Sequence, residues 1–402
     1  MRTYLTLVGF EYKKIFKSKS AIIALVVGVI LFIASPLTIF FGTSYIDGEP
    51  FENHYDAMVK DRGYAYALSG RAIDEVLLAE TRDAYSMIPS VERYGTSPEY
   101  QEYARPYSGV FRILNSVYDY SLDLEGVKNL TAEDIRAFYQ TRHDNVASSI
   151  RAGAISDAAK DMLIKFDNEI YTPFIYAFTG GFDSLFANIY SIGIICAFIL
   201  AICLAPMFAG EYSTRADQLI LSSKFGKNKL ITAKLFTAFS IFALFFMLLI
   251  AIAYVMCMSV YGYDCWGAPF QLIGTFFAYP LTILDAVLIF AACSFLGTFL
   301  VAAITVLISS KFKSPFGVII IVSVLLFAPM MIHVPETMVR LHNFFSLLPA
   351  NMMALWIVFS HVPFDLFGLI VLPYVALPVF AILAGAAMLP FAWRGFRDHQ
   401  IG

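Results

Sequence analysis

The chain alternates long apolar runs with short polar links, and one long polar segment separates the first run from the second. A run of about 20 apolar residues crosses a bilayer as a helix. Six runs meet this condition, at about residues 20–41, 187–208, 233–260, 283–308, 315–331 and 367–390. The pattern therefore predicts an all-α membrane protein with six transmembrane helices. We assign the first helix to 20–43 and the other five to 186–402.

The first 19 residues have the pattern of an amphipathic helix. Apolar side chains recur at spacings of three and four, namely Tyr4, Leu5, Val8, Tyr12, Ile15 and Phe16. Lysines gather toward the end of this segment, namely Lys13, Lys14, Lys17 and Lys19. A helix of this kind lies along the membrane surface, with its lysines reaching the headgroups. We therefore expect an interfacial amphipathic helix at 1–19. The lysines would equally hold the first span's cytoplasmic end in place, and the two roles are compatible.

The polar segment at 44–185, called the polar insert below, predicts a separate and mainly helical domain. It holds 36 of the 59 charged residues, 13 basic and 23 acidic, and none of the five cysteines. Its fold therefore cannot rest on disulfides. Helix starts are indicated at Ser97-Pro98-Glu99, at Thr131-Ala132-Glu133-Asp134 with a helix running to about Ile150, and at Ser156 with a helix through Ile170. We find no strand-like alternation of useful length.

The distribution of positive charge orients the predicted spans. Hydrophobic residues make up 59% of the chain and charged residues 15%, whereas a soluble domain has about 25% charged. Lysine and arginine are concentrated in both termini and in the 209–234 and 309–314 links, whereas 261–282 has none and 332–366 has only Arg340. Positively charged links stay in the cytoplasm. We therefore expect a multi-pass protein of the cell membrane, with both termini cytoplasmic and the polar insert extracellular.

Asp285 is the one acidic residue within a predicted span. A carboxylate inside a membrane is a candidate functional group. However, Thr282-Ile283-Leu284-Asp285 follows the capping-box pattern at the start of span four. We prefer the capping interpretation.

The sequence shows no catalytic motif. No phosphate-binding GxxxxGK[ST] loop occurs, so the chain is not expected to hydrolyse ATP. Five histidines expected outside stand at no metal-site spacing, namely His54, His143, His333, His342 and His361. A surface metal site between spans five and six, where three of them lie, is the less favoured interpretation. We therefore assign no catalytic residue, no metal site and no nucleic-acid partner.

The link that follows span two carries the most informative motif. It reads Ala209-Gly210-Glu211-Tyr212-Ser213-Thr214-Arg215-Ala216-Asp217-Gln218-Leu219-Ile220-Leu221-Ser222-Ser223-Lys224-Phe225-Gly226-Lys227, and Lys234-Leu235 follow. This resembles the cytoplasmic loop of ABC-2 type transporter permeases, the membrane-spanning subunits of bacterial ABC exporters. In that family an acidic residue closes span two, and a Gly-Thr pair, a Leu-Leu-Ser helix, a short basic turn and a Gly-Lys pair follow.

The match to this family pattern is partial. Glu211 fits the acid, Leu219-Ile220-Leu221-Ser222 fits the helix, Gly226-Lys227 fits the turn, and Ala233-Lys234 fits the final pair. Arg215-Ala216 stands where Gly-Thr is usual, Lys224 where Pro is usual, and Ala233 where Gly is usual. The resemblance extends to the predicted topology, including a broken helical stretch before span six that contains Leu348-Pro349.

The resemblance implies a cytoplasmic coupling helix at about 211–230. Its ATPase-coupling residues would be Glu211, Arg215, Leu219, Ile220, Leu221, Ser222 and Lys227. It also implies two copies of a separate ABC ATPase subunit, which would hold ATP and magnesium, and a second permease chain in a homodimer or heterodimer. The chain would itself carry no cofactor and contact the lipid bilayer. Antibiotics, antimicrobial peptides, lipids and ions are the implied substrates. A peptide, antibiotic or other amphiphile is favoured because no span carries a charged relay.

The physical chemistry of the link agrees with a coupling role. Leu219, Ile220 and Leu221 are apolar residues expected in the cytosol, and such residues need a partner. An ATPase groove or the chain's own membrane surface would supply it. Glu211 is expected to pair with the lysines of the following turn.

The alternative function is a membrane sensor or receptor whose extracellular domain binds a ligand. An intramembrane enzyme is less favoured because the spans hold no His, Glu or Asp cluster.

Overall fold

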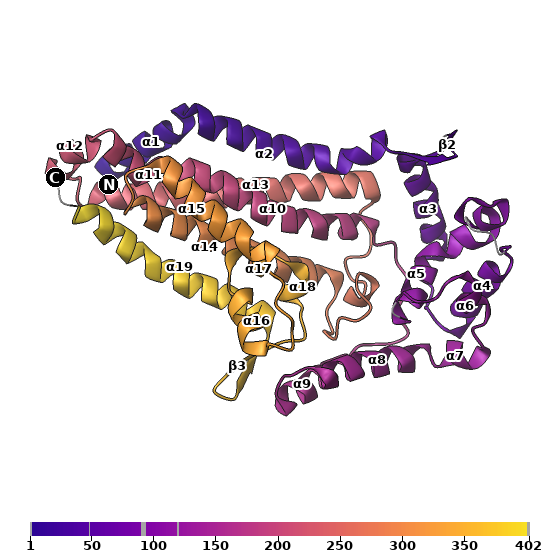
Figure 1. Ribbon diagram of the computed structural model, residues 1–402. Helices are drawn as coiled ribbons and strands as arrows, with labels where there is room; N and C mark the ends of the chain where they lie inside the picture. Colours follow the sequence, from indigo (N-terminus) through magenta and orange to yellow (C-terminus); the bar gives the residue numbers. More distant parts are fainter. Residues whose placement is uncertain (1, 48, 90–93, 119, 400–402) are drawn as a thin grey trace. The chain divides into compact units, whose positions relative to one another are not determined.

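The computed structural model describes residues 2–47, 49–89, 94–118 and 120–399, and this part of the chain is mainly helical (Figure 1). Five of its helices are long and apolar enough to cross a membrane, namely Lys19–Phe41, Gly180–Ser213, Lys229–Tyr261, Ile283–Ser309 and Pro373–Arg397. The chain is therefore a multi-pass membrane protein. It forms two compact units, the first comprising Met1–Ser35, Phe186–Tyr254 and Ile289–Gly402, and the second Pro36–Leu185 and Val255–Leu288.

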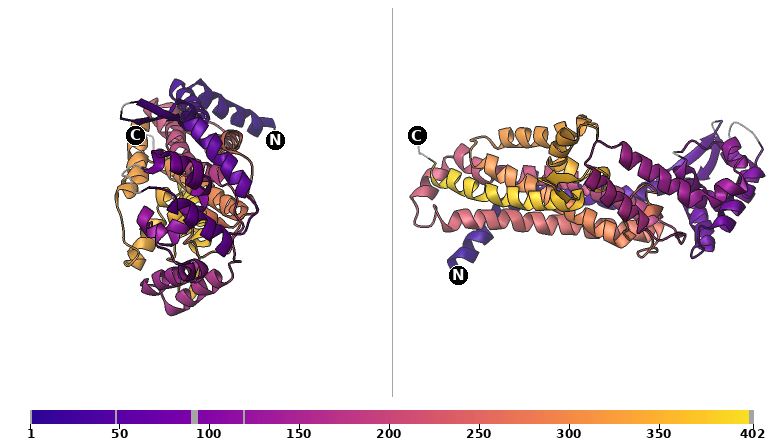
Figure 2. Two further views of the ribbon diagram at one scale, coloured as in Figure 1. Left: turned by 90° about the vertical axis from the view of Figure 1, so that its right-hand side faces the viewer. Right: turned by 90° about the horizontal axis from the view of Figure 1, so that it is seen from below.

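Long helices that run side by side build the first unit (Figure 2). The helices that contribute to it are α1 (Arg2–Lys17), α2 (Lys19–Leu37), α10 (Gly180–Leu204), α11 (Pro206–Ser213), α12 (Ala216–Ser222), α13 (Lys229–Tyr261), α14 (Ile283–Ser309), α15 (Pro315–Phe327), α16 (Val339–Ser346), α17 (Pro349–Met352), α18 (Leu355–Val358) and α19 (Pro373–Arg397). Ser18 alone separates α1 from α2. The three short helices α16, α17 and α18 form the broken helical stretch predicted around Leu348-Pro349.

A stripe of small residues lets α10 and α11 pack closely against α14 and α15. Gly193, Ala197, Ala201, Ala205 and Ala209 recur at every fourth position, and the four alanines are fully buried. Small residues at this spacing allow helix backbones to approach each other within a membrane. The close approach lets hydroxyl groups of α14 form hydrogen bonds to the neighbouring backbone. The serine and threonine side chains of α14 donate at 2.7–3.3 Å to carbonyl oxygens of α10 and of Ala205, the residue between α10 and α11, namely Ser294 to Ile189, Thr298 to Gly193 and Ser309 to Ala205.

The predicted fifth span is a shorter helix than the other five. α15 has 13 residues and continues as the 3-10 turn η6 (Ala328–Met331). Pro329 lies in this turn and cannot donate a backbone hydrogen bond, so the α-helix ends before it. In the described residues, five spans thus reach full length, and a six-span arrangement stays a prediction.

The start of the predicted sixth span is corrected by the structure. Residues 367–372 do not belong to a helix, because β3 (Phe364–Leu366) and β4 (Leu369–Val371) form an antiparallel hairpin there. Phe367 and Gly368 make its turn with φ of 57° and 91°. Positive φ at both central positions is the geometry that two-residue hairpins favour. Helix α19 begins only at Pro373, a favourable first helical residue.

The second unit contains the polar insert. Its elements are η1 (Thr38–Phe41), β1 (Thr43–Ile46), β2 (Glu49–Asn53), α3 (His54–Leu68), α4 (Glu75–Ser86), η2 (Tyr94–Thr96), η3 (Tyr100–Ala104), η4 (Arg105–Tyr107), α5 (Ser108–Val117), α6 (Leu124–Lys128), α7 (Ala132–Arg136), α8 (Phe138–Ala152), α9 (Asp157–Asn168) and η5 (Phe270–Leu272). The insert is mainly helical, as predicted. The antiparallel hairpin of β1 and β2 was not expected, because it is too short to show alternation in the sequence.

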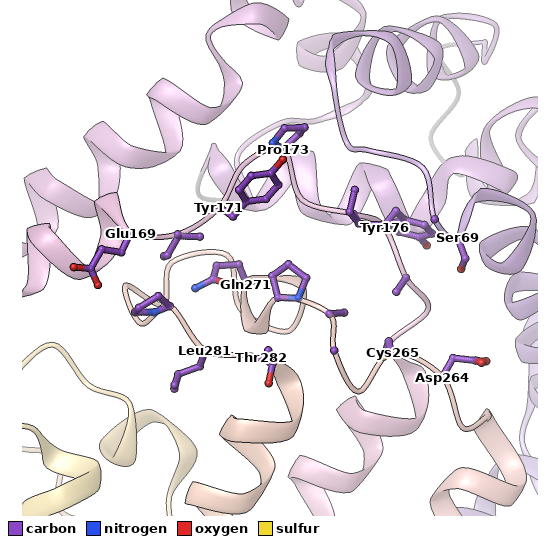
Figure 3. Close-up of a pocket in the computed structure, with 18 of the residues that line it drawn as sticks. Ser69, Glu169, Tyr171, Pro173, Tyr176, Asp264, Cys265, Gln271, Leu281 and Thr282 are labelled. Carbon is purple, nitrogen blue, oxygen red and sulfur yellow. The ribbon is translucent and has the colours of Figure 1, made fainter.

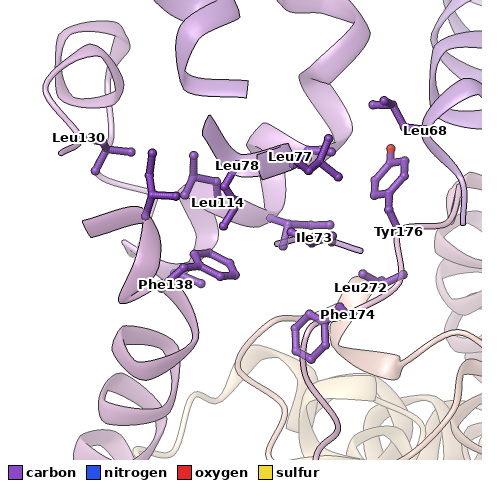
Figure 4. Packing of buried hydrophobic residues seen from close by; sticks show 14 of the residues in the cluster. Leu68, Ile73, Leu77, Leu78, Leu114, Leu130, Phe138, Phe174, Tyr176 and Leu272 are labelled. Carbon is purple, nitrogen blue, oxygen red and sulfur yellow. The ribbon is translucent and has the colours of Figure 1, made fainter. Parts of the chain in front are cut away.

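One apolar core holds the helices of the insert together (Figure 4). Ile73, Leu77, Val110, Val117 and Phe174 are inaccessible to solvent within it. Leu272 joins the same core from the segment between α13 and α14. The insert therefore packs its apolar groups without any disulfide, and the five cysteines of the chain are free.

A buried ion pair fixes the segment between α13 and α14 to the insert. The Arg142 guanidinium lies 2.6 Å from Asp167, and it donates to the carbonyl oxygens of Thr275 and Phe277 at 3.0 and 3.1 Å. His143 contacts the other Asp167 oxygen at 2.7 Å. Both members of the pair are buried, and the hydrogen bonds satisfy their polar groups, which burial of a charge requires.

The capping signals have three different outcomes. Thr131 and Asp134 form the predicted capping box, and so do Thr282 and Asp285 at the start of α14. Asp285 is thus a capping residue, as preferred. Ser97 accepts a hydrogen bond from the Tyr100 amide, as expected of a cap. The hydroxyl of Ser156 makes no capping hydrogen bond to α9, although Ser156 does precede this helix.

Candidate functional site

The link between spans two and three contains a short helix and two tight turns. α11 ends at Ser213, and α12 starts after Arg215, which adopts a left-handed backbone conformation with φ of 58°. This conformation favours glycine, since a β-carbon crowds the backbone there. It falls where the sequence has Arg215-Ala216 instead of the Gly-Thr pair usual in the resembling family. The backbone conformation at position 215 therefore favours glycine, but this sequence has arginine there.

The three apolar residues of α12 differ in exposure. The Leu219 side chain is 78% exposed, Ile220 is partly exposed, and Leu221 is only 5% exposed. The expectation that all three residues need an ATPase groove or the membrane surface as a partner is therefore wrong for Leu221, which packs inward. Asp217, also buried, lies 3.7 Å from His399. Leu219 remains as the large apolar group that α12 presents outward.

The turn after α12 depends on Gly226. A β-carbon on Gly226 would overlap with the carbonyl oxygen of Ile220, so no other residue fits without a backbone shift. The Ser223 amide donates to that same carbonyl at 3.1 Å, and the Gly226 amide donates to Ser223 at 3.3 Å. Ser222 and Lys227 are exposed on either side of this turn. The chain direction therefore reverses within a few residues, and α13 begins at Lys229.

Both ends of this link meet in a buried cluster of charged residues, called the charge cluster below. Lys234, near the start of α13, is fully buried. Its ammonium group donates to Glu211 of α11 at 2.9 Å, to Glu11 of α1 at 3.0 Å and to the Met207 carbonyl oxygen at 2.9 Å. An ammonium group has three protons to donate. Each proton of Lys234 thus has an acceptor.

Lys14 completes the charge cluster from the more exposed side. Its ammonium group lies 2.7 Å from Glu211 and 3.0 Å from Glu11. Burial lowers the pKa of Lys14, but the hydrogen bond to Glu211 and the charges of Glu11 and Glu211 outweigh burial and raise it. Lys14 therefore stays charged at neutral pH. Two carboxylates and two ammonium groups balance, which is the condition under which buried charges are tolerated.

The partners of Glu211 correct one prediction. Glu211 does not pair with the lysines of the following turn, but with Lys14 and Lys234, which are 197 and 23 residues away in sequence. A contact between helices depends on tertiary packing, so the local sequence could not specify it. The sequence did contain an indication that Glu11 is buried and paired. It stands on the same helical face as Val8 and Ile15, and all three are buried. An acid on an apolar face implies a buried partner.

The charge cluster joins three elements at one point. α1, α11 and α13 each contribute at least one charged side chain, and α12 lies in the link between α11 and α13. A displacement of α12 therefore acts on helices whose ends are ion-paired to each other and to α1. The Phe208 ring, 5.7 Å from the Lys234 ammonium, adds a cation–π contact to this point.

Metal ligation is not indicated by the described side chains. Among residues 2–47, 49–89, 94–118 and 120–399, no group of three or more His, Cys, Asp or Glu side chains could hold a metal ion. His342 instead contacts the Val334 carbonyl oxygen at 3.2 Å.

No protein-family model, curated protein or solved structure matches this chain. Its function must therefore be inferred from its own residues.

Proposed function

We propose that this protein is the membrane-spanning subunit of an ABC transporter, driven by a separate ATPase that docks on α12. The observation that carries this proposal is that two features occur in the same link. Leu219 faces outward on α12, and one buried charge cluster connects the two ends of the link. An exposed leucine on a short helix indicates a protein surface that covers it. The charge cluster supplies a rigid connection from that helix to the spans.

In the proposed mechanism, ATP binding draws two ATPase subunits together and displaces α12 with them. Packed elements move as units, because cores do not deform continuously. Glu211 and Lys234 tie the two ends of the link together, and Glu11 and Lys14 attach α1 to them. The displacement then reaches the spans that α11 and α13 continue. Arg215, Ser222 and Lys227, which are exposed around α12, would make the polar contacts with the ATPase.

The proposed assembly has two permease chains, identical or related, above two ATPase subunits that bind ATP and magnesium. The termini and the 209–234 link lie in the cytoplasm, and the polar insert lies outside the cell. This orientation follows from the positions of lysine and arginine. The transported substrate is a peptide, an antibiotic or another amphiphile, moved outward.

Replacement of Leu219 by aspartate tests the ATPase contact. The variant loses a buried apolar contact worth roughly 1.5–3 kcal/mol and adds the desolvation cost of a charge. We expect the ATPase to stop co-purifying with the permease, and ATP hydrolysis by the membrane complex to fall with it. Gln218→Asp is the matched control, because it places the same charge on the neighbouring exposed residue of α12.

The outcome also separates this function from a sensor or receptor. The Leu219 side chain makes little contact within the chain, so Leu219→Asp should leave insertion and the folded state unchanged. A Leu219→Asp protein that still holds its ATPase would show that α12 is not the docking element. A wild-type chain that purifies from its native membrane without any ATPase would contradict the transporter role itself.

A further inference from the structure

A cavity of about 890 Å³ lies in the second unit, between the insert and the segment that joins α13 to α14 (Figure 3). Three tyrosines contribute to its wall, Tyr66, Tyr171 and Tyr176. Its floor is fixed, because the buried Gln271 donates two hydrogen bonds, to the carbonyl oxygens of Phe277 and Tyr279 at 3.0 and 2.8 Å. The cavity is therefore preformed and large enough for a small organic molecule.

Part of the apolar surface that lines the cavity is exposed to solvent. The Tyr171 side chain is 79% exposed and Ile175 is 45% exposed. Aromatic and aliphatic groups that surround an open cavity are the surface that small ligands bury. An occupant with an apolar body would cover both.

All of the formal charge on the lining residues is negative. Glu169 and Asp264 line the cavity, and none of the described residues that line it is a lysine, arginine or histidine. The two acids stand at opposite ends of the cavity in Figure 3. Glu169 lies 3.9 Å from Lys165 at the surface. Asp264 accepts a hydrogen bond from Tyr66, and partial burial together with this bond raises the pKa of Tyr66 to about 12.

The charge of the surrounding domain has the same sign. The polar insert carries 23 acidic against 13 basic residues, a net charge of −10. A negative field concentrates cations near such a surface and disfavours anions. Tyrosine faces attract alkylammonium groups as well.

From these features we infer that the cavity is a binding site for an organic cation with an apolar body, held by Glu169 and Asp264 at its ends and by Tyr171 along its length. The site would take alkylammonium or similar amphiphilic cations and reject anions of the same shape. It goes beyond the coupling role proposed above and does not depend on it, because binding requires no ATPase.

Calorimetric titration of the full chain in nanodiscs of zwitterionic lipid tests this inference. The probe is decamethonium, which has a trimethylammonium group at each end of a ten-carbon chain. The matched anion is decane-1,10-disulfonate, of the same chain length and opposite charge. We expect saturable binding of decamethonium and none of the disulfonate. Empty nanodiscs provide the baseline for both probes.

Substitutions in the wall identify the site. Glu169→Gln and Asp264→Asn should each weaken decamethonium binding by roughly fivefold, the change that corresponds to about 1 kcal/mol for one ion pair. The double variant should bind still more weakly. Asp161→Asn, an exposed acid on α9 outside the cavity, is the control and should leave binding unchanged.

Tyr171 supplies a second test that does not disturb folding, since its side chain is largely exposed. Tyr171→Ala should weaken binding, whereas Tyr171→Phe retains the ring and should bind like the wild type. Equal binding of the two probes, or unchanged decamethonium binding in Glu169→Gln, Asp264→Asn and Tyr171→Ala, would overturn the inference. Failure of decamethonium to bind the wild-type chain would overturn it too, without affecting the ATPase contact at α12.

Discussion

At the scale of single residues, Lys234 is a charged side chain that depends on its partners because it is fully buried. It is buried against Glu11, Glu211 and the Met207 carbonyl oxygen. Removing one partner of a buried pair leaves the opposite charge without compensation, which costs about 3–5 kcal/mol. Lys234→Met keeps most of the side-chain volume and removes the charge, so we expect a loss of at least about 3 kcal/mol in the free energy of unfolding.

Thermal unfolding in detergent measures this loss, with Lys17→Met as the control. Lys17 is exposed on α1, and its substitution should change stability by less than about 0.5 kcal/mol. Adding Glu211→Gln to Lys234→Met should cost less than the sum of the two single changes, because the two residues share one interaction. Additive costs would mean that the charge cluster does not act as a unit.

Gly226 is a second residue whose identity is dictated by its surroundings, because they leave no room for a side chain. A β-carbon there overlaps with the Ile220 carbonyl oxygen, so Gly226→Ala must shift the turn after α12. We expect weaker ATPase co-purification from this variant. Gly63→Ala, at a helical position with no atom near the added carbon, should be neutral or stabilising. Equal co-purification of the Gly226→Ala and wild-type proteins would show that the turn geometry does not matter.

At the scale of elements, sequence patterns predicted the structures whose interactions are local. The Thr131–Asp134 and Thr282–Asp285 capping boxes each lie within four consecutive residues, and both formed as expected. The start of α19 was misplaced because a short apolar run such as 367–372 is compatible with either a helix or a strand. The partners of Glu211 were missed because they come from other helices. Contacts distant in sequence leave no local pattern to detect.

The small-residue stripe on α10 gives a prediction at this scale. Ala201 is fully buried against α14 and α15, so Ala201→Leu overpacks the contact and should cost about 1–3 kcal/mol. Ala187→Leu, on an exposed face of the same helix, is the control. Chemical unfolding of the two variants compares them. Similar stability would indicate that the helices separate readily to admit the larger side chain.

The pairing of Arg71 with Glu80 in the insert gives a pH dependence. The Arg71 hydrogen bond at 2.8 Å, opposed by a smaller effect of burial, holds the pKa of Glu80 below its usual range. A carboxylate with a lowered folded-state pKa stabilises the fold above its unfolded pKa of about 4.3, and this contribution is lost as pH falls through the folded value. The stability difference between wild type and Arg71→Gln should therefore be constant from pH 6 to 8 and shrink below about pH 4.

The control for this pH series is Arg136→Gln. Arg136 lies 3.7 Å from Glu75, and both side chains are well exposed. This variant should differ little from wild type at any pH, since exposed pairs contribute about 0–1 kcal/mol. A difference between wild type and Arg71→Gln that is unchanged at pH 3 would contradict the role assigned to Glu80.

At the scale of the whole molecule, the positions of lysine and arginine predict the orientation in the membrane. Single cysteines at Ser148 in the insert and at Ser223 after α12, both exposed, test it in a background without native cysteines. An impermeant maleimide added to intact cells should label position 148 and spare position 223. Labelling at both positions would reject the topology with a cytoplasmic 209–234 link and an extracellular insert.

The docking of an ATPase on α12 is tested most directly by a photoreactive amino acid at position 219 in native membranes. Leu219 is 78% exposed, and its counterpart for comparison is Leu244, 67% exposed in the middle of α13. On illumination, position 219 should cross-link to a protein that binds ATP and carries a phosphate-binding loop, whereas position 244 should cross-link to no such protein. Cross-links from position 219 to lipid alone would show that α12 rests on the membrane, and would contradict the proposed function.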